Sequence, residues 1–289
     1  MRLYPAPEHG PFVFGKSAKR ALLLHGFPGT PWELRAVGRL LADLGYEAHA
    51  PLLPGFGPQI SSLDRRCRYD WQASASAALA SLLPGAEEVL LVGYSMGAAL
   101  ATTVAVSQAQ ASSRQPQRLV LINPFSGLGV PLATLLGLVT PFVPSYRPFV
   151  KADFDDPWVR EVLGRMVPDL DIDDLAWRER VRREVCIPVV AVDQVCRLGA
   201  EAWRSAPAAT VPTLVVQGRE DNVVSPRRTR RFTRRLGGPV RLRETAGGHV
   251  VIWPGKPGHG ELVGELTRFL RDPAASRTPT AAAVRRRSR

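Results

Sequence analysis

A serine lies where an apolar run passes directly into a stretch of small residues, within residues 87–100. Residues 90–92 are continuously apolar rather than alternating, which is typical of a parallel strand covered on both faces. The small residues at 98–101 can pack a helix closely against such a sheet, so the turn between strand and helix must be sharp. The sequence therefore predicts a central parallel strand, a tight turn and a helix.

The turn has the pattern Gly93-Tyr94-Ser95-Met96-Gly97. In a G-x-S-x-G elbow a strained serine raises its hydroxyl above the sheet, and the glycines remove side chains that would collide with strand and helix. Ser95 is therefore the candidate nucleophile. The alternative is a serine that caps the following helix. The strand before Ser95 and the helix after it favour the nucleophile.

Length and composition predict one α/β domain with an insertion, because 289 residues with 45% hydrophobic content can bury a single large core. No apolar run is as long as a membrane span, and residues 1–9 lack the apolar centre of a signal peptide, so we expect a cytoplasmic protein.

Cys67, Cys186 and Cys196 form no metal-binding pattern. We interpret them as buried reduced thiols, with a Cys186–Cys196 disulfide as the alternative.

A net charge of +12 and a pI near 10.5 raise the hypothesis of nucleic-acid binding. The arginines are scattered through the predicted helices without interleaved aromatic residues or a nucleic-acid motif, so solvated helix faces are the simpler interpretation. Residues 272–289 carry five arginines against one aspartate and have no apolar face, which predicts a disordered basic tail. A weak contact of this tail with an acidic partner or an anionic surface is the alternative.

Strand and helix patterns alternate along residues 1–123 and resume along 210–271, which predicts a core with a mostly parallel sheet and helices on both faces. Between them, residues 124–209 contain helix patterns at 158–167 and 188–203 but no evident strand of the main sheet. We interpret 124–209 as a helical cap inserted above the sheet. The alternative is a longer crossover between two strands.

Side chains that follow parallel strands meet at one edge of the sheet, and sites form there. A serine nucleophile needs a base, usually histidine, oriented by a carboxylate. His249 follows the last predicted strand on two glycines and is the candidate base, with His259 as the alternative. Asp221 follows the strand at 211–217 and is the candidate acid, with Glu220 and Asp193 as alternatives. His25 more simply shapes the glycine turn that follows it.

An acyl-transfer intermediate also needs N–H donors for its oxyanion. In a strand–elbow–helix architecture they are the amide after the nucleophile and one from the loop after an early strand, positions that Met96 and Phe27 occupy. The other interpretation of Phe27 is an ordinary buried aromatic residue in a turn. Both hold together, because the donor is the backbone N–H.

Four segments resemble the α/β-hydrolases, particularly the bacterial carboxylesterases and monoacylglycerol lipases. They are residues 22–29 (LLLHGFPG), 93–97 (GYSMG), 217–221 (QGRED) and 248–250 (GHV). The order Ser, Asp, His is also that of the superfamily. The resemblance implies an α/β-hydrolase fold of about eight strands, hydrolysis through an acyl-enzyme, no cofactor and no metal, and a small helical cap that bounds the acyl pocket. The cap sequence itself matches no pattern of the family.

These features predict a serine hydrolase acting on small-molecule carboxylic esters of short to medium acyl chain. Part of the apolar surface of residues 128–143 should line a pocket above Ser95. The predicted substrate-binding residues are Phe27, Met96, Leu128, Val139 and Phe142. A thioesterase or acyltransferase with the same triad is the alternative. A non-catalytic binding protein of this fold is a further one, against which the complete triad argues.

Overall fold

The computed structural model describes residues 4, 7–112, 114–128, 137–138, 140, 142–166 and 171–272. Within them the main sheet has seven strands in the order β1-β3-β2-β4-β5-β8-β9, all parallel to their neighbours except β1. Their bounds are Phe12–Phe14 (β1), Lys19–Leu24 (β2), Glu47–Ala50 (β3), Glu88–Tyr94 (β4), Arg118–Ile122 (β5), Thr213–Gly218 (β8) and Val240–Thr245 (β9). The predicted α/β-hydrolase fold with a mostly parallel sheet is confirmed.

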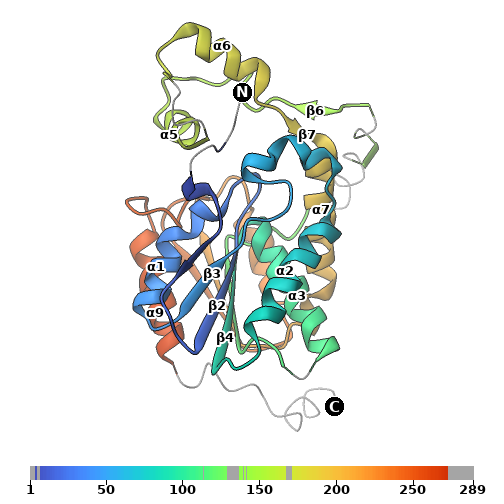
Figure 1. Cartoon of the computed structure of the whole chain (residues 1–289), viewed down its shortest axis with the longest axis vertical. Coiled ribbons are helices and arrows are strands. Elements are labelled where there is room, and N and C mark those ends of the chain that lie inside the picture. Colours follow the sequence, from blue (N-terminus) through green and yellow to red (C-terminus); the bar gives the residue numbers. More distant parts are fainter. Residues whose placement is uncertain are drawn as a thin grey trace.

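Helices cover both faces of this sheet (Figure 1). Those on one face are α1 (Arg35–Asp43) and α9 (His259–Arg271), and those on the other are α2 (Arg68–Leu82), α3 (Met96–Ala111), α7 (Val189–Ser205) and α8 (Pro226–Thr233). The short 3-10 helices are Pro7–His9, Pro31–Leu34, Gly57–Arg65 and Ala206–Ala208. Leu22 and Leu24 pack with α2 and α3, whereas Ala21 and Leu23 pack with α1 and α9. This double burial explains the continuous apolar strand runs.

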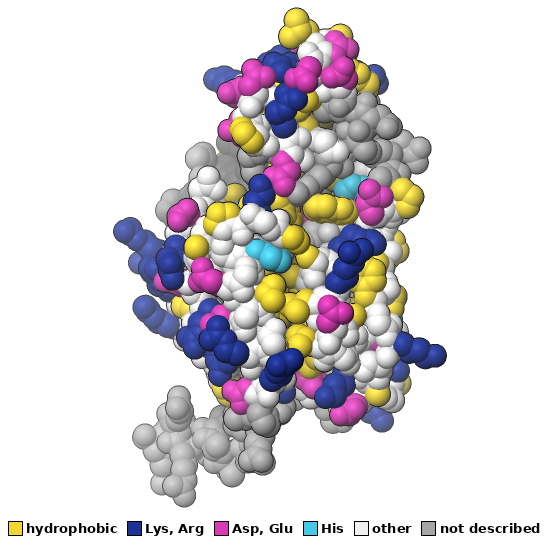
Figure 2. Space-filling view, turned by 90° about the vertical axis from the view of Figure 1, so that its left-hand side faces the viewer, with side chains coloured by type: hydrophobic (Ala, Val, Ile, Leu, Met, Phe, Trp, Pro, Cys, Tyr) yellow, Lys and Arg dark blue, Asp and Glu magenta, His cyan; other side chains and the backbone are white. Residues whose placement is uncertain are grey.

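A smaller layer stands beyond one end of the sheet (Figure 1). It contains α5 (Pro157–Met166), α6 (Leu175–Glu184) and the two-stranded ribbon of β6 (Ser145–Tyr146) and β7 (Ile187–Pro188). Its buried side chains form a cluster of their own, which includes Phe154, Leu163 and Val181. Figure 2 shows charged side chains of both signs intermixed at the tip of this cap. The ion pairs Arg160–Asp173 at 2.9 Å and Arg178–Asp155 at 2.7 Å belong to this region.

The helix α7 does not lie in the cap, although the sequence placed it there. It packs along α3, and its apolar residues Ala191, Leu198 and Ala202 are buried in the same cluster as α2 and α3. The part of the chain that stands above the sheet therefore ends near Pro188 rather than at residue 209. The sequence alone does not distinguish the two positions, because a helix with one apolar stripe has the same pattern whether it covers a sheet or a cap.

The three cysteines are free, so the structure contains no Cys186–Cys196 disulfide. Cys196 is buried, and burial raises the pKa of its thiol to about 11. Cys186 is exposed, so the prediction of a buried thiol is wrong there.

Each helix in the described part of the chain is too short or too polar to cross a bilayer. The predicted tail lies outside the described residues apart from Asp272.

Candidate active site

Ser95 joins β4 to α3 with backbone angles of φ 54° and ψ −118°. A positive φ is strained for a serine and persists only where the surroundings enforce it. The Ser95 N–H donates to the carbonyl of Ile122 at 2.9 Å. A Cβ atom at Gly97 would lie 2.0 Å from the carbonyl oxygen of Leu24, so only glycine lets α3 pack this closely against β2. The tight elbow expected from the sequence is present, and Ser95 is 7% exposed.

His249 lies between Ser95 and Asp221. Its Nε2 atom is 3.0 Å from Ser95 Oγ, and its Nδ1 atom is 2.8 Å from Asp221 Oδ2. A carboxylate only accepts hydrogen bonds, so Nδ1 carries the proton and Nε2 accepts from the serine hydroxyl. This tautomer is the one in which a histidine can remove the serine proton.

The Asp221 carboxylate is fully buried and held by several donors. Its Oδ1 atom accepts from the backbone N–H groups of Val223 at 2.9 Å and Val224 at 2.8 Å. Its Oδ2 atom accepts from the side-chain amide of Gln217 at 3.2 Å as well as from His249. These bonds satisfy a buried charge and fix its orientation.

The alternative acids and base are placed elsewhere. Glu220 is exposed. Asp193 lies on α7 and accepts from Arg197 at 2.6 Å. His259 begins α9, and its Nδ1 atom donates to the carbonyl of Val251 at 3.1 Å. Of the side chains considered from the sequence, Asp221 and His249 are the ones that lie beside Ser95.

His25 is completely buried beneath the glycine turn. Its Nδ1 atom donates to the carbonyl of Gly26 at 2.9 Å, and its Nε2 atom accepts from the N–H of Leu53 at 3.2 Å. Burial lowers the pKa of His25 to about 4, so the imidazole is neutral at pH 7. As expected, it shapes the loop rather than acting as the base.

The buried imidazole of His25 predicts acid sensitivity. Between pH 6.5 and about 4 the unfolded chain binds a proton here and the folded chain does not. The stabilisation is therefore complete above pH 6.5 and is lost as the pH falls, by about 3 kcal/mol over this window. Urea unfolding at a series of pH values measures this loss. In His25→Gln the free energy of unfolding should fall less steeply over the same range, and an unchanged slope would contradict the assignment.

The turn after β2 lies directly against Ser95. A Cβ atom at Gly26 would be 3.2 Å from Ser95 Cβ. The Gly26 N–H donates to the carboxylate of Glu33 at 3.2 Å, so both polar backbone groups of this residue are held by side chains. Phe27 follows at once. Met96 is the first residue of α3, where backbone N–H groups have no acceptor within the helix. The oxyanion role of the Phe27 and Met96 amides stays a prediction.

An apolar cavity of about 250 Å³ lies between this edge of the sheet and the cap, bordered by His249 and Tyr94. Its other walls come from residues 4 and 9 near the N-terminus, residues 28–33, the 3-10 helix Gly57–Arg65, the cap and the segment after His249. The hydrophobic side chains among them include Trp32, Ile60, Phe149, Val162, Met166, Ile187 and Trp253. Glu33 is the carboxylate among the described residues that line it. The cavity suits the apolar part of a small ligand.

Those predicted pocket residues that the structure describes do not border this cavity. Phe142 is 84% exposed, and half-buried Leu128 is not among the described residues that border the cavity. Val139 lies outside the described residues. The Met96 side chain is buried in the core. The Phe27 ring packs against the ring of Phe56, with 5.9 Å between the ring centres. The cap side of the cavity is built instead from residues within 148–166 and 185–188. A pocket wall needs side chains converging from several elements rather than one apolar run.

Two residues that sequence reasoning missed touch the backbone of the candidate base. The carbonyl oxygen of His249 accepts from Asn123 Nδ2 at 2.6 Å and from the Tyr94 hydroxyl at 3.0 Å. Asn123 directly follows β5, so the strand-end argument that found Asp221 and His249 also applied to it.

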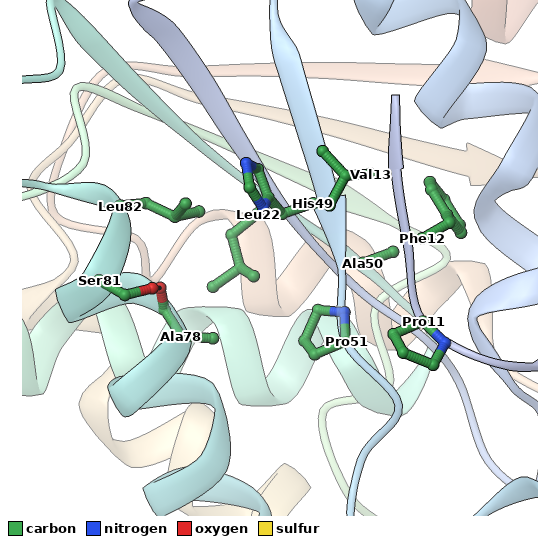
Figure 3. Close-up of a pocket in the computed structure, with 10 residues that line it drawn as sticks. All are labelled: Pro11, Phe12, Val13, Leu22, His49, Ala50, Pro51, Ala78, Ser81 and Leu82. Carbon is green, nitrogen blue, oxygen red and sulfur yellow. Dashed lines mark hydrogen bonds between the residues drawn. The ribbon is translucent and has the colours of Figure 1, made fainter. Parts of the chain in front are cut away.

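A second hollow, of about 300 Å³, lies at the edge of the sheet that β1 forms (Figure 3). It is lined by residues in or directly beside β1, β2, β3 and α2, and its polar side chains are His49 and Ser81. His49 Nε2 is 2.6 Å from Glu47 Oε1. Ser95, Asp221 and His249 do not border this hollow, whereas His249 borders the other cavity. The described residues hold no cluster of three or more His, Cys, Asp or Glu side chains able to bind a metal.

Comparison with known proteins shows the family of the chain. A family model described as the alpha/beta hydrolase family matches residues 21–262. A thermostable monoacylglycerol lipase of Bacillus sp. (strain H-257) is 24% identical over 216 residues, which are 75% of this chain and 76% of that protein.

Two solved structures share the fold. A structure of the metagenome-derived lipolytic enzymes LipS and LipT has a TM-score of 0.72 and 21% identity, covering 92% of this chain and 98% of that one. The RedJ thioesterase of the prodiginine pathway in Streptomyces coelicolor has a TM-score of 0.57 and 20% identity, covering 87% of this chain and 90% of that one.

Proposed function

Because the chain belongs to the alpha/beta hydrolase family, we propose that it hydrolyses carboxylic esters of short to medium acyl chain through an acyl-enzyme intermediate. The observation that carries the proposal is the continuous hydrogen-bonded series from Ser95 Oγ through His249 to Asp221. The cavity beside His249 supports an apolar acyl group. The lipase name of the Bacillus relative supports an ester bond as the one that is cleaved.

In the proposed reaction Ser95 Oγ attacks the ester carbonyl while His249 Nε2 takes the hydroxyl proton. Asp221 stabilises the imidazolium that forms. The negative charge on the carbonyl oxygen faces the backbone N–H groups of Phe27 and Met96. The tetrahedral intermediate then expels the alcohol, which receives the proton from His249. A water molecule repeats the sequence on the acyl-enzyme, releases the carboxylic acid and restores Ser95.

The experiment compares kcat/KM for oxygen esters and thioesters that carry the same acyl group. We expect faster turnover of the oxygen ester. A clear preference for the thioester would instead favour the thioesterase alternative, whose support is the fold shared with RedJ. Turnover of neither substrate, with no covalent labelling by a fluorophosphonate, would leave a binding protein as the better account.

Acyl chain length should have a large effect on kcat/KM. Each methylene buried in the cavity contributes about 0.8 kcal/mol, so four extra carbons raise kcat/KM by roughly two orders of magnitude until the cavity is full. A cavity of about 250 Å³ fills with a short to medium chain. Rates on acetyl, butyryl, octanoyl and palmitoyl esters of p-nitrophenol test this. No rise from acetyl to butyryl, or a best rate on palmitoyl, would contradict it.

Two variants test whether the preference for acyl chain length depends on this cavity. Val162 lines the cavity, so Val162→Phe should lower the rate on octanoyl esters relative to acetyl esters by filling the space. Val150 is also in the cap but is 52% exposed, so Val150→Phe is the matched control and should leave that ratio unchanged. Equal ratios in the two variants would place the acyl chain elsewhere.

A further inference from the structure

Asn123 occupies an unusual position at the end of β5. It is completely buried and has φ 44°, a left-handed conformation that asparagine tolerates better than most residues. Its own N–H donates to the carbonyl of Val216 in β8 at 2.8 Å. The main chain is therefore fixed, and the side chain is directed among the loops that carry the candidate acid and base.

The Asn123 side chain uses both ends of its amide. Its Oδ1 atom accepts from the N–H of Gly218 at 2.9 Å. Its Nδ2 atom donates to the carbonyls of His249 at 2.6 Å and Gly248 at 3.3 Å. Gly218 ends β8, three residues before Asp221. One buried side chain therefore links the strand that leads to the acid with the loop that holds the base.

Tyr94 reaches the same carbonyl oxygen of His249 from the residue before Ser95, with its hydroxyl at 3.0 Å. Burial raises the pKa of this hydroxyl well above its usual value, so it keeps its proton and donates. The Tyr94 ring is also 5.2 Å from the His249 ring, centre to centre. The main chain of His249 is thus held from the ends of both β4 and β5.

We propose that Asn123 is a positioning residue for His249, with Tyr94 as its partner on the same carbonyl oxygen. The inference rests on the proposed function and adds a requirement to it. Position 123 needs a side chain that donates and accepts at once over this distance, which aspartate and leucine of similar shape do not provide. Misplacing a catalytic group by about 1 Å lowers a rate by roughly 100-fold.

The test is Asn123→Asp, which keeps the shape but directs a carboxylate oxygen at two carbonyl oxygens. We expect kcat to fall roughly 100-fold with KM nearly unchanged, because the apolar cavity is intact. The matched control is Gln117→Glu at the other end of β5. Gln117 also bridges backbone groups, accepting from the N–H of Val89 at 2.6 Å and donating to the carbonyl of Gln115 at 2.8 Å. Its kcat should stay near that of the wild type.

A readout independent of turnover separates positioning from general destabilisation. The proton on His249 Nδ1, hydrogen-bonded to Asp221, should give a far-downfield NMR signal in the wild type. This signal should shift or disappear in Asn123→Asp and stay in Gln117→Glu, at temperatures below each midpoint of unfolding. If Asn123→Asp does not fold, Tyr94→Phe removes one donor from the same oxygen and should lower kcat roughly tenfold at unchanged KM.

Two failures are distinguishable. If the folded Asn123→Asp protein, or Tyr94→Phe in its place, keeps both the wild-type kcat and the NMR signal, positioning by this pair is overturned while the hydrolase stands. If Gln117→Glu loses kcat and the signal to the same degree as Asn123→Asp, the effect is one of general stability and the proposal also falls. A wild-type protein that turns over no ester and resists fluorophosphonate labelling refutes the proposed function instead.

Discussion

Replacing Ser95 with alanine should lower kcat for ester hydrolysis by about 10⁶-fold, with the fold intact. The hydroxyl is the atom that bonds to the acyl group, so nothing else at the site replaces it. The variant should also lose covalent labelling by a fluorophosphonate, which reacts only with an activated hydroxyl. Circular dichroism and thermal unfolding confirm that the elbow still folds.

The matched control is Ser126→Ala. Ser126 is also a buried serine, 2% exposed, on the loop that follows β5. Its hydroxyl takes no part in the proposed chemistry, so this variant should keep both activity and labelling. Labelling that persists in Ser95→Ala, at any other serine, would end the assignment of the nucleophile.

Replacing Asp221 with asparagine should lower kcat by about 10⁴-fold. The Oδ1 position of this side chain receives two backbone N–H groups, so an asparagine must place its carbonyl oxygen there. Its amide nitrogen then faces His249 Nδ1 and forces that atom to be the acceptor. The proton moves to Nε2, where it blocks removal of the serine proton.

The control for this prediction is Glu220→Gln, which changes an exposed carboxylate next in sequence. It should behave like the wild type. Steady-state rates for the two variants, measured on one butyryl ester, distinguish Asp221 from Glu220 as the acid. A near-normal rate for Asp221→Asn, or a large loss in Glu220→Gln, would reassign the acid.

The sequence predicted the features that follow from where the strands lie along the chain and which residues come directly after them. Continuous apolar strands forced a sheet covered on both faces, and in a parallel sheet the residues after each strand share one edge. That reasoning, together with the G-x-S-x-G elbow and the need of a serine for a base and a carboxylate, selected Ser95, His249 and Asp221. The structure joins them in one hydrogen-bonded series through His249. The two glycines of the elbow marked the place where helix and strand approach most closely.

The cavity wall and the extent of the cap were less predictable, for a physical reason. The wall collects single side chains from distant segments, such as Trp32, Val162 and Trp253, and no window of sequence contains them together. In the apolar run of residues 128–143, by contrast, the described residues Leu138 and Phe142 are exposed. Asn123 also follows a strand, but it was missed because an amide is neither the nucleophile, the base nor the acid for which the strand ends were searched.

The separate apolar cluster of the cap has a consequence for how proteins of this architecture diverge. Phe154, Leu163 and Val181 pack within the cap, outside the two clusters that hold the sheet and the Ser95 elbow, and half-buried Val162 packs against both the cap cluster and the cluster of α1 and α9. Mutational effects at distant sites without shared partners add rather than compound. Single substitutions among the cap residues other than Val162 can therefore change the cap one residue at a time, while Ser95, His249 and Asp221 keep their places. The cap is the part of the fold in which related proteins with one chemistry can evolve different substrate preferences.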